Sequence, residues 1–85
     1  MNDAPAPDAI VAEILSQVHA RAPKTVCPSE IARALASEEA AWRALMPQVR
    51  THAATLAAAG RLRVTQKGRA VDALTARGPI RLAAP

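Results

Sequence analysis

The chain has 85 residues, of which 51 % are hydrophobic and mostly alanine, and it carries a net charge of +4. This length allows one small domain, a single cysteine excludes an internal disulfide, and no apolar stretch approaches the roughly 18 residues of a membrane span. The first ten residues lack the pattern of a secretory signal, so we expect a cytoplasmic protein that does not bind membranes.

The charge is divided unevenly along the chain. Residues 1–42 carry three basic and six acidic groups, a net −3, whereas residues 43–85 carry eight basic groups and one acid, Asp72, a net +7. A strongly basic half is typical of proteins that bind polyanions. The alternative is that the arginines only keep an alanine-rich surface soluble.

The first part of the chain predicts a disordered tail followed by a helix. Residues 1–7 are rich in proline and alanine and have no periodicity, which is typical of a tail. Asp8 is the expected helix cap, and Pro23 ends the helix near Arg21. Between them the apolar residues recur at helical spacing: Ile10, Val11, Ile14, Leu15 and Val18.

A second, shorter helix is predicted over residues 28–36. Pro28 suits the first helical position, and Glu30 falls at the third, where a carboxylate meets free backbone amides. Cys27 then occupies the cap position, where we interpret it as an indifferent cap residue rather than a reactive thiol. Just before it, Thr25 and Val26 are able to add to the edge of a sheet.

The third helical region runs from a Ser37 cap to a stop at Gly60. Pro47 lies in its middle, where proline removes a hydrogen bond and clashes with the preceding turn. We therefore expect a kink or break near residues 44–46 and a new helix over residues 47–59.

The two faces of this region differ in chemistry. Met46, Val49, Ala53, Leu56 and Ala57 share one face and are expected in the core. The opposite face carries Gln48, Thr51 and Thr55, and a glutamine is able to pair with adenine in a DNA groove. Arg50, on the flank, has two interpretations: an ion pair with Glu30, Glu38 or Glu39, or a phosphate contact.

After Gly60 the period changes from 3.6 to 2, which predicts a hairpin over residues 61–72. Leu62 and Val64 face inward and Arg61, Arg63 and Thr65 outward, with the turn at residues 67–69 and a return through residues 69–71. A loop over residues 72–79 then leads to a short extended segment, in which Ile80 and Leu82 face inward and Arg81 outward.

Three helices followed by a hairpin predict a mainly helical α+β fold of the winged-helix type: a helix-turn-helix core, a hairpin wing and a short C-terminal strand. We place this domain at residues 8–82, between tails at residues 1–7 and 83–85. The phrases SEIARAL, WRALMPQVR, LAAAGRLRVTQKG and GPIRL over residues 9–82 resemble a small bacterial family catalogued only as a domain of unknown function. The resemblance implies the fold and brings no activity or functional residue.

We expect this protein to bind nucleic acid, DNA or structured RNA, mainly through backbone phosphates. The candidate contact residues are Gln48, Thr51, Thr55, Arg61, Arg63, Lys67 and Arg69. Two alternatives remain at this point. The cations are able to act only as a solvated edge that prevents sheet aggregation, or the domain is an adaptor that binds an acidic protein.

Enzymatic chemistry is not expected. His19 and His52 lie on different predicted helices and, with one cysteine, give no zinc-ligand spacing. No Ser-His-Asp set, paired carboxylates or phosphate-binding glycine loop is present, so we expect no catalytic residue, metal or cofactor. Trp42, the single aromatic residue, is interpreted as a core anchor near a helix junction, with a base-stacking platform as the alternative.

Overall fold

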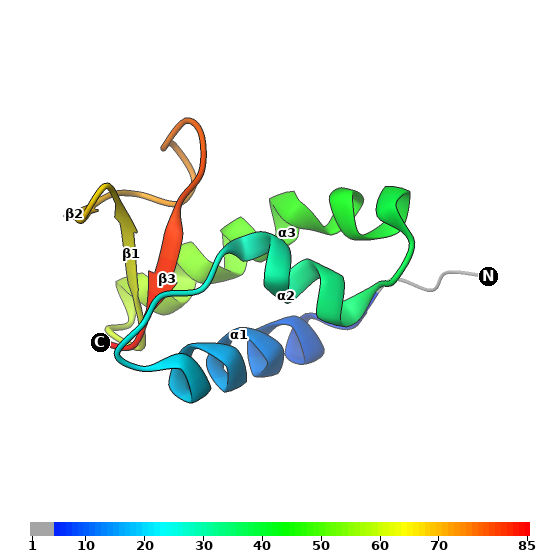
Figure 1. Ribbon diagram of the computed structural model, residues 1–85, viewed down its shortest axis with the longest axis horizontal. Coiled ribbons are helices and arrows are strands. Elements are labelled where there is room, and N and C mark those ends of the chain that lie inside the picture. The colour runs from blue at the N-terminus through cyan, green and yellow to red at the C-terminus, as the bar shows by residue number, and fades with distance from the viewer. Residues whose placement is uncertain (1–4) are drawn as a thin grey trace.

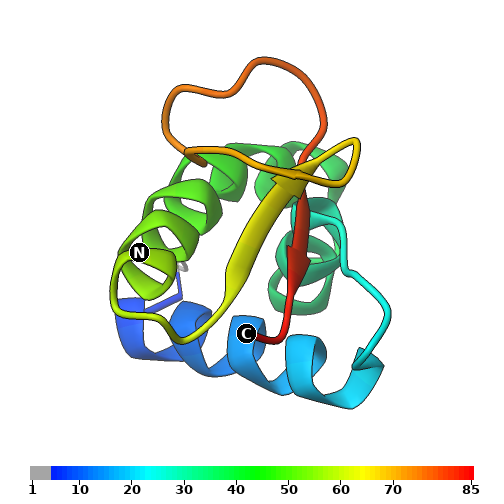
Figure 2. The same ribbon diagram turned by 90° about the vertical axis from the view of Figure 1, so that its left-hand side faces the viewer.

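The computed structural model describes residues 5–85, which form three helices followed by a three-stranded antiparallel sheet (Figure 1). This mainly helical α+β arrangement is winged-helix-like, as predicted. The sheet lies across one end of the helices, and Figure 2 looks onto that end. The elements in chain order are α1 (Pro7–Arg21), α2 (Pro28–Leu35), α3 (Glu39–Ala58), β1 (Arg63–Gln66), β2 (Arg69–Ala70) and β3 (Arg81–Ala83).

Helix α1 begins before the predicted cap. Ala6 is the cap residue and Pro7 the first helical residue, so Asp8 lies in the first turn instead of capping it. Proline costs no hydrogen bond there because the first amides of a helix have no intrahelical partner. An acid in the first turn interacts favourably with the positive end of the helix dipole. Of the predicted tail at residues 1–7, residues 1–4 lie outside the described part of the chain. The end of α1 at Arg21 confirms the prediction.

Helix α2 forms as its sequence predicts. Cys27 is the cap, and its backbone N–H donates to the Glu30 carboxylate at 3.0 Å, which completes a capping box. The helix ends at Leu35, one residue earlier than predicted. The next cap is Glu38 and not Ser37, so that prediction is wrong by one position.

Pro47 does not break α3, and the prediction of a second helix from residue 47 is wrong. The helix continues through the proline because Pro47 lies on its exposed face. There the carbonyl four residues before the proline, which lacks an N–H partner, meets solvent. The helix is able to open slightly on this outer side. The buried stripe Leu45, Val49, Ala53 and Leu56 runs along the inner face on both sides of the proline and holds the two halves together.

The core lies between the helices and the inner face of the sheet and contains aliphatic side chains. Its largest fully buried members are Ile10, Ile14, Val18, Val26, Ile31, Val49, Ile80 and Leu82. Trp42 packs against this core but is half-buried, so its interpretation as a core anchor holds only in part. The guanidinium groups of Arg33 and Arg43 lie over its ring, 4.5 and 4.9 Å from the centroid.

Strand β1 is the centre of the sheet, between β2 and β3. It pairs with β2 through a two-residue turn in which Lys67 and Gly68 have φ of 52° and 80°, the pattern of a type I′ hairpin. Val26 adds a bridge to Leu82, which confirms the predicted edge pairing. Strand β3 includes Ala83, which is buried, so the packed structure reaches past residue 82.

Candidate nucleic-acid interface

Most of the basic residues in the second half of the chain gather on the sheet and its connections. Arg43 and Arg50 lie on α3. The remaining six are all exposed, and we call them the sheet-end cations: Arg61, Arg63, Lys67, Arg69, Arg77 and Arg81. Within residues 5–85 the ion pairs are Arg21–Glu30 and Arg43–Glu39, so none of the six has a carboxylate partner there.

The alternation of the strands decides which of these cations face outward. Val64 and Leu82 are opposite each other and buried, so their neighbours Arg63 and Arg81 lie on the outer face, as predicted. The Arg81 Nε donates to the Thr25 hydroxyl at 2.8 Å, and the Arg63 Nε donates to the carbonyl of Ala84 at 3.1 Å. Each guanidinium is oriented by one side of its fork and keeps other N–H groups free.

Arg50 forms no ion pair with an early glutamate within residues 5–85, so that prediction is wrong. The alternative, a phosphate contact, stays a prediction. The Arg50 guanidinium donates to three carbonyls of the loop between β2 and β3, those of Ala73 at 3.4 Å, Ala76 at 2.9 Å and Gly78. A fixed fork of donors is suited to several carbonyls at once, so Arg50 fastens this loop to α3.

Gln66, at the end of β1, holds the same loop from the other side. Its Nε2 donates to the carbonyl of Arg77 at 2.6 Å and to that of Pro79 at 3.1 Å. The loop is the orange segment that arches over the sheet and α3 in Figure 2. Because two side chains bind five of its residues, the loop presents Arg77 from a fixed backbone.

The fastened loop creates a hollow with three cations in its wall, which we call the cationic hollow. It is lined by Gln66, Lys67, Arg77, Pro79 and Arg81. Lys67 was predicted as a contact residue from its place in the hairpin turn. Arg77 and Arg81 were not, although they contribute to the +7 charge of the second half.

The polar residues of α3 form a second group. Gln48, Thr51 and Thr55 are exposed, as their helical spacing predicts. The Thr51 hydroxyl donates to the carbonyl of Pro47 at 2.9 Å, and the Thr55 hydroxyl donates to that of Thr51 at 3.2 Å. Both hydroxyl oxygens still have lone pairs to offer a partner.

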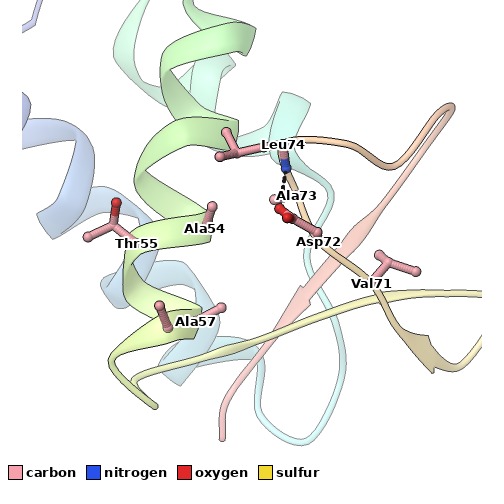
Figure 3. Close-up of a pocket in the computed structure, with 8 residues that line it drawn as sticks. Ala54, Thr55, Ala57, Val71, Asp72, Ala73 and Leu74 are labelled. Atoms are coloured by element: carbon pink, nitrogen blue, oxygen red, sulfur yellow. Dashed lines mark hydrogen bonds between the residues drawn. The ribbon is translucent and has the colours of Figure 1, made fainter.

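Thr55 borders a hollow of different chemistry from the cationic one. Figure 3 shows this hollow between the C-terminal half of α3 and residues 71–74 of the loop. Its wall includes Asp72, whose carboxylate accepts from the Leu74 N–H at 2.8 Å, and Leu74 is itself 61 % exposed. The structure therefore places the predicted contact residues in two groups, and the negative Asp72 lies beside the α3 group.

One glutamate near the sheet end interacts with positive groups and with a backbone N–H that lower its pKa. The backbone N–H of Cys27 and the Arg21 guanidinium, with a weaker contribution from the charge of Arg81, hold the pKa of Glu30 below its ordinary value of 4.5. Glu30 is thus ionised at neutral pH, and its carboxylate interacts with the first turn of α2 and with Arg21. It leaves Arg81 without a direct carboxylate contact.

Within residues 5–85, no three His, Cys, Asp or Glu side chains come together as ligands for a metal ion. In the same part of the chain, every helix is too short or too polar to cross a membrane.

A family model covers the part of the chain that carries this surface. The model described as "Protein of unknown function (DUF3253)" matches residues 7–85. The chain belongs to this family. The DUF3253 match spans all three helices and all three strands, which agrees with the resemblance seen in the sequence. None of the curated proteins matches the chain, so the surface itself must supply the inference about function.

Proposed function

We propose that this chain is a nucleic-acid-binding domain that contacts backbone phosphates through its sheet-end cations. The observation that supports this proposal is the gathering of six exposed cations, without carboxylate partners in the described residues, at one end of the fold. Such a surface attracts a polyanion and releases its counterions on binding. In the bacterial cytoplasm in which we place the protein, duplex DNA is the expected ligand, and structured RNA offers the same phosphates.

The backbone at Lys67 gives separate support. Its φ of 52° lies in the left-handed region, where glycine and asparagine are favoured and a long side chain carries a conformational cost. Asn-Gly would satisfy this turn better than Lys-Gly. A cation at an unfavourable backbone position, at the tip of an exposed hairpin, supports a contact that needs its charge.

The α3 group supplies the base contacts in this proposal. Gln48, Thr51 and Thr55 offer uncharged donors and acceptors, and small alanines beside them permit close approach to a groove. Affinity then comes mainly from the sheet end, and any sequence preference comes from α3. No catalytic step is part of the proposal.

The direct test is fluorescence anisotropy with a labelled random-sequence DNA duplex in a salt series. For about four phosphate contacts, the binding constant should fall by about 100-fold between about 50 and 200 mM salt. Arg69→Gln removes a sheet-end cation and should weaken binding, whereas Arg43→Gln removes an equal charge on α3 and should have little effect. Absence of binding at the lowest salt, or equal losses in the two variants, would contradict the proposal.

The second candidate is an adaptor that binds an acidic protein, and the exposed Leu74 favours it. This leucine lines the hollow that also contains Ala54, Ala57 and Val71, and it is exposed. A protein partner would cover such an apolar spot, whereas a phosphate backbone gains nothing from it. The test is affinity capture after nuclease digestion. A partner retained by the natural chain and lost with Leu74→Ser would support the adaptor.

A further inference from the structure

The cationic hollow has features of a binding site for a single anion. Its three cations come from separate places in the sequence: Lys67 from the hairpin turn, Arg77 from the loop and Arg81 from β3. No carboxylate is among the residues that line it. Like charges repel one another when they are brought together in this way, and an anion between them relieves that repulsion.

One of the three cations is oriented before any ligand arrives, and a second is carried on a bound stretch of backbone. Arg81 is oriented by the hydroxyl and carbonyl of Thr25, which accept from its Nε and Nη2. These contacts leave its Nη1 without a described acceptor. The backbone of Arg77 is held through its carbonyl, which accepts from Gln66. A site whose donors are already ordered loses less conformational entropy on binding.

The charge of the hollow favours a dianion over a monoanion. An internal phosphodiester of DNA carries one negative charge, whereas a phosphate monoester carries about −1.5 to −2 at pH 7 and has three strong acceptor oxygens. Three cations that line one hollow match the charge of a phosphate monoester better than that of a phosphodiester. The hollow has a volume of about 520 Å³ and is open to solvent, so it has room for the phosphate and the sugar that carries it.

We infer that the cationic hollow binds the terminal phosphate of a nucleic-acid strand, with Lys67, Arg77 and Arg81 as its ligands. This inference rests on the proposed function and narrows it, because it directs the protein to strand ends. Along an internal stretch of duplex, the sheet-end cations provide weaker contacts with single phosphodiesters.

The test uses two DNA hairpins of identical sequence, each with a single blunt end, that differ only in a 5′-phosphate. Binding is measured by anisotropy of a label in the hairpin loop, near 150 mM salt. The phosphorylated hairpin should bind about tenfold more tightly, the effect of one or two charge-assisted hydrogen bonds. Equal affinity for the two hairpins would overturn the inference and leave the proposed function intact. Absence of binding to both would overturn the two together.

Variants separate the hollow from the rest of the cationic surface. Arg77→Gln should reduce the preference for the phosphorylated hairpin to about onefold to twofold and should keep most of the binding to the unphosphorylated one. Arg69→Gln, which removes an exposed sheet-end cation outside the hollow, should weaken both hairpins equally and keep the preference. A preference that survives in Arg77→Gln, with the fold verified by circular dichroism, would also overturn the inference.

Discussion

The arginines of the helices and those of the sheet end differ in what they contact. On the helices, Arg21 and Arg43 form ion pairs, Arg33 and Arg43 cover the Trp42 ring, and Arg50 binds loop carbonyls. At the sheet end, the described partners are neutral oxygens or none. The first group is explained by the fold, whereas the second has unused donors and charge. This difference indicates which arginines are available to a ligand, and substitutions in each group test it.

The largest expected effect is on binding. Replacing Arg63, Lys67 and Arg69 together by glutamine should lower DNA affinity by about 100-fold at low salt and reduce the slope of log K against log salt by about three. The free energy of unfolding should change little, because none of the three is in an ion pair in the described structure. Anisotropy and urea denaturation measure the two quantities. A large loss of stability with unchanged affinity would show instead that these cations serve the fold and not a ligand.

Arg50→Ala tests the helix group. The substitution leaves the carbonyls of Ala76 and Gly78 without their donor and releases the loop from α3. We expect the free energy of unfolding to fall by about 2 kcal/mol, since hydrogen bonds to a charged donor are involved. Arg50→Lys keeps the charge and loses the fork, so it should recover only a small part of that stability. If the lysine variant were as stable as the natural chain, charge rather than hydrogen-bond geometry would explain the contribution of Arg50 to stability.

The role of Arg50 also shows where prediction from the sequence ends. The end of α1 at Arg21, the Cys27–Glu30 capping box and the alternation of Leu62 and Val64 depend on neighbours within a few positions, and all were predicted. Arg50 binds residues 23 to 28 positions away in the chain. No local pattern records such a pairing, so the predicted ion pair with an early glutamate was wrong. The cationic hollow depends on that pairing, which is why Arg77 was not among the predicted contacts.

Pro47 shows the opposite case, in which a local rule is overridden by packing. Proline disfavours a helix interior by about 3 kcal/mol, yet α3 continues because its buried stripe is continuous. Pro47→Ala should therefore raise the free energy of unfolding by about 1 to 2 kcal/mol. This is less than the full penalty because Pro47 lies on the exposed face of α3, where a helix is able to adapt to it. Thermal unfolding followed by Trp42 fluorescence measures the change. A destabilised alanine variant would show that the proline contributes a needed distortion.

A smaller effect is expected from the pH dependence of stability. Since the pKa of Glu30 is lower in the folded chain than its ordinary 4.5, its stabilising contribution is present above that value and is lost as the pH falls through the folded pKa. Between about pH 5 and pH 2 the natural chain should lose more stability than Glu30→Gln, which has no charge to titrate. Parallel curves from urea denaturation would contradict the assigned role. Glu13→Gln, which removes a helix carboxylate whose described partner is the uncharged Gln17, serves as the matched control.

The smallest change in stability is also the sharpest test of the comparison. Lys67→Asn places Asn-Gly in the type I′ turn, where asparagine tolerates a φ of 52° better than lysine does. The free energy of unfolding should stay the same or rise by a few tenths of a kcal/mol. If Lys67 serves a ligand, DNA affinity should nevertheless fall by about fivefold, because one phosphate contact is lost. A variant with a more favourable turn and weaker DNA binding would show that Lys67 serves the ligand rather than the fold. Unchanged affinity would instead mean that the tip of the hairpin is a solvated edge.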